Sequence, residues 1–347
     1  MTKKLKVGNL YIGGGERVTV QSMTNTPTCD VEKTVEQIKR LEVAGCDIVR
    51  VTVNTEKASM AIRDIVDKSS VPIVADIHFD YKLALKSIEN GVSKLRFNPG
   101  NIGDFKNVKL IADCAKTHGV PIRVGVNGGS LEKDILEKYG RTPKALVESA
   151  LRHVKLLEDA NFYDTVISVK ASSPKSTVDA YRLLSKECDY PLHVGVTEAG
   201  SDDEGIYKSV SAMGSLLLDG IGDTIRVSLT GDPVKEVEVG KKLLRAVGLD
   251  KDYVEVVSCP TCGRCALDLE SIVKEIKTKT AHIKKPLKVA VMGCVVNGLG
   301  EAGDSDFGIA GGQDKSVLFI KGQVVKSIPN DTIVTELLKL CGEFTNE

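Results

Sequence analysis

Between residues 18 and 230, short runs of β-branched and other apolar residues alternate with longer segments whose apolar residues recur at helical spacing. Each run is followed by a loop and then by an amphipathic segment, which is the pattern of repeated strand–helix units. Strands are predicted at residues 18–23, 48–53, 71–77, 94–97, 121–126, 165–169, 191–196 and 224–229. Helices are predicted between them, at segments that include 31–44, 56–68, 81–90, 108–118, 143–160 and 177–186.

Eight strands that alternate with helices favour a (β/α)8 TIM barrel, a fold that usually takes about 250 residues. An open, doubly wound sheet is the alternative, because the number of strands does not prove that the sheet closes. Residues 232–247 are predicted to form the last barrel helix, so the barrel domain is expected to span 1–248. A smaller α/β domain is expected at 249–347, with a glycine-rich loop at 297–312 before a hairpin and a final helix.

Composition narrows the class of protein. The chain has 347 residues, and its 47 basic residues balance 47 acidic ones, so no general field favours nucleic acid or an anionic membrane. Residues 1–6 lead into no signal-like apolar segment, and no apolar run is long enough to span a bilayer, so a cytoplasmic protein is expected. Five scattered cysteines are interpreted as small buried side chains: Cys29, Cys46, Cys114, Cys188 and Cys341.

Polar residues on the predicted strands recur with period two, so within each strand they share the face that lines the barrel interior. They crowd toward the carboxyl ends of the strands, where barrel enzymes bind their substrates. The candidate binding residues are Arg50, Asp76, His78, Arg96, Asn98, Arg123, Asn127, Lys170, Thr197, Arg226 and Ser228. Because unpaired buried cations cost several kcal/mol each, this cationic set predicts a phosphorylated substrate, with internal salt bridges as the alternative.

Three further side chains have specific interpretations. Lys170, late on the sixth strand, could be a Schiff-base lysine, but the arginines around it favour pairing with phosphate. His193 is interpreted as a structural interior histidine. Glu198 follows the seventh strand at the mouth of the barrel and is the best-placed general acid.

The second domain opens with a cysteine motif, Cys259-Pro260-Thr261-Cys262-Gly263-Arg264-Cys265, and a further cysteine, Cys294, follows the next predicted strand. This spacing is typical of metal ligands, and thiolates select zinc or iron–sulfur clusters. Spacing alone leaves the metal open and nominates Cys265 as the fourth sulfur.

Several segments resemble the 4-hydroxy-3-methylbut-2-enyl diphosphate synthase family. In the barrel they are Gln21-Ser22-Met23-Thr24, Ala75-Asp76-Ile77-His78-Phe79, Leu95-Arg96-Phe97-Asn98-Pro99-Gly100-Asn101-Ile102-Gly103, Arg123-Val124-Gly125-Val126-Asn127-Gly128-Gly129-Ser130 and Gly195-Val196-Thr197-Glu198-Ala199-Gly200. In the second domain they are Cys259-Pro260-Thr261-Cys262 and Gly293-Cys294-Val295-Val296-Asn297-Gly298. The resemblance covers both domains and is highly specific.

The resemblance implies a barrel similar to dihydropteroate synthase and a C-terminal domain that holds a [4Fe–4S] cluster. It implies the reductive ring opening and dehydration of 2-C-methyl-D-erythritol 2,4-cyclodiphosphate, a step of isoprenoid biosynthesis. It also implies electrons from reduced ferredoxin or flavodoxin, and a head-to-tail homodimer in which each cluster domain caps the barrel of the partner.

The family's cluster ligands match Cys259, Cys262, Cys294 and Glu301 in this sequence. Oxygen binds iron–sulfur iron more weakly than thiolate does, so Glu301 is also expected to take part in catalysis as an exchangeable ligand. Two positions depart from the family: Cys265 is not usually cysteine, and Leu299 stands where proline is common. Cys265 therefore leaves an all-sulfur site as the alternative.

Other functions were weighed against this one. A phosphosugar aldolase or isomerase with a structural zinc site is the main alternative. A radical enzyme that uses S-adenosylmethionine would need three cysteines after the first strand, where only Cys29 lies. A zinc-ribbon-like binding module is disfavoured, because the second domain has no aromatic–basic surface on which nucleic acid could stack.

Overall fold

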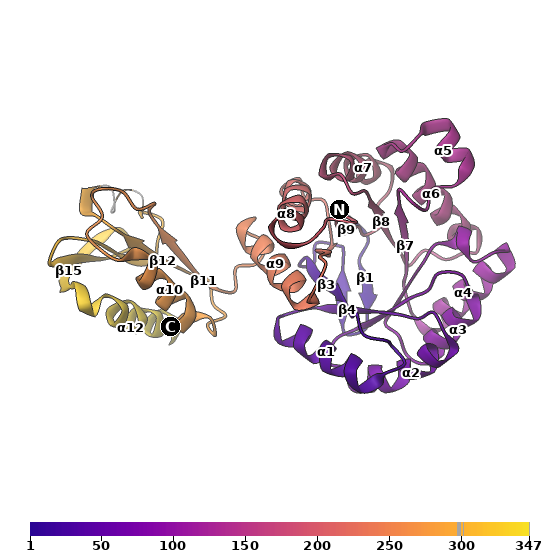
Figure 1. Cartoon of the computed structure of the whole chain (residues 1–347), viewed down its shortest axis with the longest axis horizontal. Helices are drawn as coiled ribbons and strands as arrows, with labels where there is room; N and C mark the ends of the chain where they lie inside the picture. The colour runs from indigo at the N-terminus through magenta and orange to yellow at the C-terminus, as the bar shows by residue number, and fades with distance from the viewer. Residues whose placement is uncertain (297–299, 301, 347) are drawn as a thin grey trace. The chain divides into compact units, whose positions relative to one another are not determined.

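The computed structural model describes residues 1–296, 300 and 302–346. By its internal contacts the chain divides into two compact units, Met1–Leu249 and Asp250–Glu347. In Figure 1 the first unit runs from indigo to orange and the second from orange to yellow. No helix in the described part of the chain is long and apolar enough to cross a membrane.

The first unit, all of which the structure describes, is a ring of eight parallel strands (Figure 1). The strands are β3 (Thr19–Met23), β4 (Ile48–Thr52), β5 (Ile73–Asp76), β6 (Lys94–Phe97), β7 (Ile122–Asn127), β8 (Thr165–Lys170), β9 (His193–Val194) and β10 (Thr224–Ile225). They pair in the order β8-β7-β6-β5-β4-β3-β10-β9, and a parallel bridge between Ile167 and Leu192 joins the two ends. The predicted TIM barrel is therefore confirmed over the open sheet.

Helices form an outer layer around these strands (Figure 1). They are α1 (Val31–Val43), α2 (Glu56–Asp67), α3 (Tyr81–Glu89), α4 (Phe105–His118), α5 (Lys133–Tyr139), α6 (Pro143–Asp159), α7 (Pro174–Glu187), α8 (Asp202–Leu218) and α9 (Pro233–Ala246). The outward-facing strand residues, such as Val51, Ala75 and Val124, pack with helix residues such as Ile38 and Ile62 in one large apolar core. Because this face of each strand is apolar, the alternate positions point into the barrel.

A small hairpin that the sequence pattern did not predict closes the amino-terminal end of the barrel. Its strands, β1 (Leu5–Val7) and β2 (Leu10–Ile12), pair antiparallel. Leu5, Val7 and Ile12 pack with three residues from the early part of barrel strands, Ile48, Val74 and Val166. The barrel interior is thus apolar at its lower end, and its polar residues lie above.

The second unit is a five-stranded sheet with helices packed on it. Its elements are β11 (Val254–Ser258), α10 (Leu269–Thr280), β12 (Leu287–Met292), β13 (Phe307–Ala310), β14 (Lys315–Ile320), β15 (Gln323–Pro329) and α12 (Ile333–Asn346). The sheet order follows the chain, with β11, β12 and β13 parallel and the last two strands antiparallel. Helices α10 and α12 contact each other and contribute Ile276 and Leu337 to the core.

Two sequence-based expectations were wrong in detail. The segment 297–312 was expected to be a loop throughout, but Phe307–Ala310 forms the central strand β13, buried along its whole length. The run is short and contains Gly308, which weakens its strand signal; a side chain there would lie 2.4 Å from the Ala290 carbonyl oxygen of the neighbouring strand. Cys46 and Cys341 are buried as expected, but Cys29 is exposed, and Cys114 and Cys188 are only half-buried.

Candidate active site

A pocket of about 230 Å³ lies among the carboxyl ends of the barrel strands. Its lining includes every predicted binding residue except Asn98, together with Ser168: Arg50, Asp76, His78, Arg96, Arg123, Asn127, Lys170, Thr197, Arg226 and Ser228. These residues come from different strands and from the loops that follow them. They meet because alternate positions of neighbouring parallel strands face the same interior.

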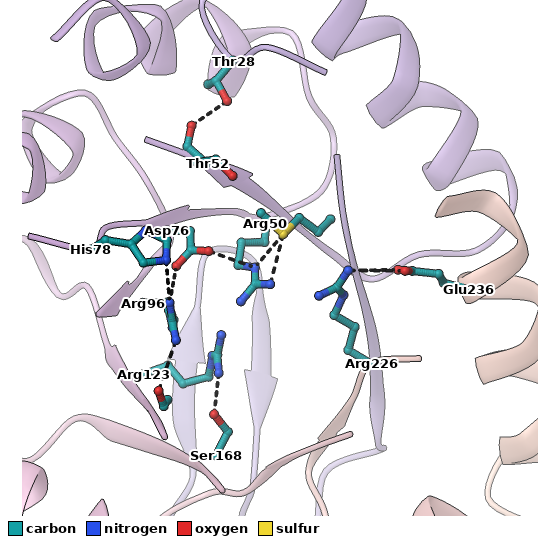
Figure 2. A network of polar contacts seen from close by, with 12 residues as sticks. Thr28, Arg50, Thr52, Asp76, His78, Arg96, Arg123, Ser168, Arg226 and Glu236 are labelled. Carbon is teal, nitrogen blue, oxygen red and sulfur yellow. Dashed lines mark hydrogen bonds and ion pairs between the residues drawn. The ribbon is translucent and has the colours of Figure 1, made fainter. Parts of the chain in front are cut away.

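Asp76 is the carboxylate at the centre of this network (Figure 2). Arg96 Nη1 donates to Asp76 Oδ1 at 3.0 Å, and Arg50 Nε lies 3.7 Å from Asp76 Oδ2. Burial alone would raise the pKa of Asp76, but Arg50 and Arg96 outweigh it and hold the pKa below its usual value. Asp76 is therefore ionised and fixes the two guanidinium groups in the pocket wall.

The remaining hydrogen bonds of Arg50 and Arg96 go to partners other than carboxylates. Arg96 Nη1 also lies 3.2 Å from His78 Nε2, and Arg96 Nη2 donates to the Gly125 carbonyl at 3.1 Å. Arg50 points two of its nitrogens at Met23 Sδ, at 3.0 and 3.2 Å. A thioether is a weak acceptor, so Arg50 keeps most of its capacity to bind an anion.

Arg123 and Lys170 are the least compensated cations of the pocket. Arg123 is 2% exposed and donates from Nη1 to Ser168 Oγ at 2.5 Å, while its Nε and Nη2 have no partner. Burial and the neighbouring cations, chiefly Arg50 and Arg96, lower the pKa of Arg123. Burial, and then Arg123 and Arg226, lower the pKa of Lys170 well below its usual value. A negatively charged ligand in the pocket would stabilise the protonated forms of both side chains.

A second carboxylate, Glu236, was not singled out in the sequence. It lies on α9, is 3% exposed, and its Oε1 is 3.3 Å from Arg226 Nη2 (Figure 2). It also accepts from Ser22 Oγ at 2.8 Å and from the Leu229 amide at 3.0 Å. Only the position of Glu236 could have indicated it in the sequence: it is four residues before Gly240 and so falls on the buried face of the helix.

The net charge of the pocket side chains indicates which kind of ligand the pocket suits. Within residues 1–249, all described, five cations line the pocket, and Asp76 and Glu236 are the carboxylates paired with them. Five positive charges against two negative ones leave three. Because buried cations without counter-charge are costly, the site suits a ligand with several negative charges, and arginine forks match phosphate oxygens.

Asn98 does not line the pocket; it holds the backbone of Gly125, which does. Its side chain is buried, and its Oδ1 accepts from the Gly125 amide at 2.9 Å. The loop after it is held by a histidine, since the Gly100 amide donates to His153 Nδ1 at 3.1 Å. His153 Nε2 lies 3.3 Å from Glu132 Oε1, so this buried histidine ties the loop after β6 to the loop after β7.

Glu198 lines a second hollow, of about 270 Å³, that shares Asn127 and Thr197 with the first. The backbone of Glu198 has φ +53°, a conformation that costs a non-glycine residue free energy and often marks a functional site. Arg141, which the sequence did not indicate, lines the same hollow. Glu198 is thus next to the cationic pocket rather than inside it.

The cysteine loops lie at one edge of the second unit's sheet. β11 and β12 are parallel neighbours, so Cys259 and Cys294 both follow the same end of the sheet. The Gly293 amide donates to Cys259 Sγ at 3.3 Å, and the Ala266 amide donates to the Gly293 carbonyl at 3.1 Å. Cys265 points its Sγ at the Leu267 carbonyl, at 3.2 Å.

The cysteines of these two loops suit a metal site with thiolate ligands. Cys259 and Cys294 follow neighbouring strands, and the Gly293 amide donates to Cys259 Sγ, as amides do around iron–sulfur clusters. Among the described residues, no three His, Cys, Asp or Glu side chains are close enough to hold a metal ion. Glu301, the predicted fourth ligand, lies outside the described residues.

The fold and the pocket define a TIM-barrel protein with a cationic site at the carboxyl ends of the strands that suits a multiply charged anion. The chain belongs to the GcpE family: the GcpE TIM-barrel domain matches residues 2–241, and the GcpE protein C-terminal domain matches residues 255–343. The family-level resemblance in the sequence is confirmed.

Curated relatives match the whole chain. A protein of Caldanaerobacter subterraneus subsp. tengcongensis is 59% identical over 100% of this chain and 98% of its own length. One of Clostridium perfringens is 56% identical over 98% and 97% of the two chains. Both are named 4-hydroxy-3-methylbut-2-en-1-yl diphosphate synthase (flavodoxin). Among solved structures, dihydropteroate synthase of Yersinia pestis matches the fold, with a TM-score of 0.51 and 12% identity over 72% of this chain and 98% of that one.

Proposed function

We propose that this chain catalyses the reductive ring opening and dehydration of 2-C-methyl-D-erythritol 2,4-cyclodiphosphate to (E)-4-hydroxy-3-methylbut-2-enyl diphosphate. The observation that carries the proposal is the excess of buried positive charge in the pocket of a GcpE-family barrel. A cyclic diphosphate supplies the missing counter-charge, and the name of the relatives supplies the reaction. The aldolase or isomerase alternative has no comparable support from the relatives.

The cations would bind the diphosphate and stabilise the charge that develops as the ring opens. Arg50 and Arg96, held by Asp76, and Arg226, held by Glu236, offer guanidinium groups that are already oriented. Arg123 of β7 and Lys170 of β8 would complete the site. When the carbon–oxygen bond to the phosphate breaks, the oxygen leaves as an anion, and fixed cations in a water-poor site stabilise such an anion strongly.

Glu198 is the proposed proton donor for the hydroxyl that leaves as water. The overall reaction takes up two electrons and two protons and releases one water. The position of Glu198 beside Asn127 and Thr197, which the two hollows share, supports this role. Asn127, His78, Thr197 and Ser228 are proposed to orient the carbon skeleton through hydrogen bonds, and Asn98 to do so indirectly through Gly125.

The electrons require a redox group. We assign a [4Fe–4S] cluster to Cys259, Cys262, Cys294 and Glu301, and when bound it would supply electrons one at a time. The arrangement of the two cysteine loops on adjacent strands supports this assignment. Reduced flavodoxin, which the names of the relatives specify, or ferredoxin is the proposed donor.

The test is anaerobic turnover of the cyclodiphosphate by iron–sulfur-reconstituted protein, with dithionite and a viologen as reductant. We expect the linear diphosphate as product. Arg123→Gln should lower kcat/KM by roughly 100-fold, because it removes a buried charge-assisted contact to phosphate. The matched control is Arg182→Gln, which removes an exposed arginine paired with Asp219 and should leave turnover at the wild-type level. Absence of product from protein with a full cluster would overturn the proposal.

A further inference from the structure

Below the cationic pocket, three polar side chains form a floor inside the barrel. They are Gln21 of β3, Lys94 of β6 and His193 of β9, and each is at most 1% exposed. Lys94 is two residues before Arg96, and His193 is two before Gly195, whose Cα faces Lys170. Because alternate strand residues share a face, these side chains point into the barrel, one layer beneath the pocket.

The floor has polar atoms without partners. Lys94 Nζ, both ring nitrogens of His193 and both amide atoms of Gln21 are buried and make no hydrogen bond to the described residues. Ile48 and Val74 of the apolar cluster around the β1–β2 hairpin are the strand-register partners of Gln21 and Lys94. Unpartnered buried polar groups are rare and costly, so this layer calls for a functional explanation.

The charged groups that act most strongly on this layer are cations. Arg123 of β7 and Arg50 of β4 act on Lys94, and with burial they lower the pKa of the Lys94 ammonium to about 7. His193 is affected by Lys170 of β8 and by Arg123, Lys94 and Arg50; burial is again the largest cause, and its pKa lies well below the usual value. Negative charge added above this layer would therefore favour the protonated forms of Lys94 and His193.

We propose that Lys94 and His193 form a second tier of the anion site, which takes up protons from solvent when a phosphorylated ligand binds in the pocket above. The occupant is taken from the proposed function, but the effect depends only on its negative charge. Anion charge favours the protonated form of each group, and by linkage each proton bound strengthens anion binding. Ligands with more negative charge gain more, so this layer favours diphosphates over singly charged anions.

The direction of the pH dependence follows from the sign of these effects. Below about pH 7 Lys94 is already protonated in the free protein, so binding an anion there takes up few protons on it. Above that pH the free protein has a neutral Lys94, and binding must recruit the proton from solvent. Affinity should thus fall as the pH rises from about 7 to about 9, by up to roughly tenfold per pH unit for each proton taken up.

Isothermal titration calorimetry tests this on the full chain. Sulfate is the probe, because it does not titrate in this range, and titrations in two buffers of different ionisation enthalpy give the number of protons taken up. For the wild type at about pH 8 we expect net proton uptake, and weaker sulfate binding at about pH 9 than at about pH 7. Sulfate binding without proton uptake, or with an affinity independent of pH, would overturn the inference without any variant.

Variants assign the uptake to the floor rather than to Lys170 in the pocket. Lys94→Met should lower the number of protons taken up with sulfate at about pH 8 and weaken sulfate binding several-fold near neutral pH, and His193→Gln should lower the number taken up in more acidic titrations. The control is Thr165→Val, which removes a buried unpartnered hydroxyl from the opposite face of β8 and should leave the uptake unchanged. Wild-type proton uptake in both floor variants would overturn the assignment.

The same titrations with the cyclodiphosphate separate this inference from the proposed function. If sulfate binding takes up protons but the cyclodiphosphate is not turned over, the proposed function is wrong and the inference stands. If the cyclodiphosphate is turned over but neither sulfate nor substrate binding takes up protons, the inference is wrong and the proposed function stands.

Discussion

At the scale of single residues, two glycines make room for the cations of the pocket. A Cβ at Gly125 would lie 2.9 Å from Arg96 Nε and 3.0 Å from Arg123 Nη1. A Cβ at Gly195 would lie 2.7 Å from Lys170 Nζ and 2.5 Å from the Arg226 carbonyl oxygen. Real Cβ atoms do not approach a backbone atom so closely, so the site requires the glycine at position 195, whereas a side chain at position 125 would displace the two arginine side chains.

This requirement gives a prediction for Gly195→Ala. The added methyl group must push away the Arg226 carbonyl and displace Lys170, so the KM for the cyclodiphosphate should rise at least roughly tenfold. The control is Gly214→Ala, inside α8, where the nearest atom, Leu243 Cδ1, is 3.6 Å away. That variant should keep wild-type kinetics and gain about 0.5–1 kcal/mol of stability, because alanine is the better helix former. Urea unfolding and steady-state kinetics measure both; equal KM values would contradict the role of Gly195.

The sequence indicated the cations of the site but not the residues that support them. Arg50, Arg96 and Arg123 were identifiable because charged residues at alternating strand positions are unusual. Lys94 shares that alternation, but it lies one layer lower, and only the fold shows the depth at which a strand residue points inward. Glu236 belongs to α9 and pairs with Arg226 at the end of the last barrel strand, and only the packing of α9 on the barrel shows that this carboxylate is buried beside the pocket.

At the scale of elements, the pocket depends on two loops that a single helix residue joins. His153 of α6 accepts from the Gly100 amide after β6 and faces Glu132 after β7, whose other oxygen accepts from Ser149 Oγ at 2.6 Å. Burial lowers the pKa of His153, so its imidazole is neutral. Because Nδ1 accepts, the proton is on Nε2 and faces the carboxylate. The fit is tight: a Cβ at Gly100 would lie 2.5 Å from His153 Cε1.

His153 is therefore expected to be a positioning residue for both loops. His153→Leu removes the acceptor for Gly100 and should raise the KM for the cyclodiphosphate by roughly tenfold, with a smaller change in kcat, since Asn98 and Asn127 border these loops. His153→Asn keeps an acceptor near the position of Nδ1 and should recover most of the lost KM. Steady-state kinetics of the two variants provide the measurement. If His153→Asn has a KM no lower than that of His153→Leu, His153 contributes only packing.

The elements themselves were largely predictable, and the exceptions have physical causes. Most barrel strands have a buried β-branched run followed by a helical period, which is a strong local signal. The β1–β2 hairpin was missed because its strands have three residues each and gain their burial from the barrel they close. β13 was missed because a glycine interrupts it and its stability comes from neighbours on both sides.

At the scale of the whole molecule, the pocket and the cysteine loops belong to different units of one chain. The pocket lies at the carboxyl ends of the barrel strands, whereas the chain leaves α9, whose carboxyl end is at the opposite, amino-terminal end of a barrel. Residues 247–253 connect α9 to β11. The family resemblance implies a head-to-tail homodimer, in which the cysteine loops of one chain would serve the pocket of its partner.

Mixing two inactive variants tests that arrangement. Cys294→Ala leaves the pocket intact and removes a proposed cluster ligand, while Arg123→Ala leaves the cysteines intact and disables the pocket. If each site takes its pocket from one chain and its cluster from the partner, half of the randomly mixed dimers contain one intact site of two. Activity should then return to roughly one quarter of the wild-type level after mixing and reconstitution. The control is each variant mixed with itself, which should stay inactive. Mixtures that also stay inactive, although mass spectrometry shows that heterodimers have formed, would mean that each chain builds its site alone.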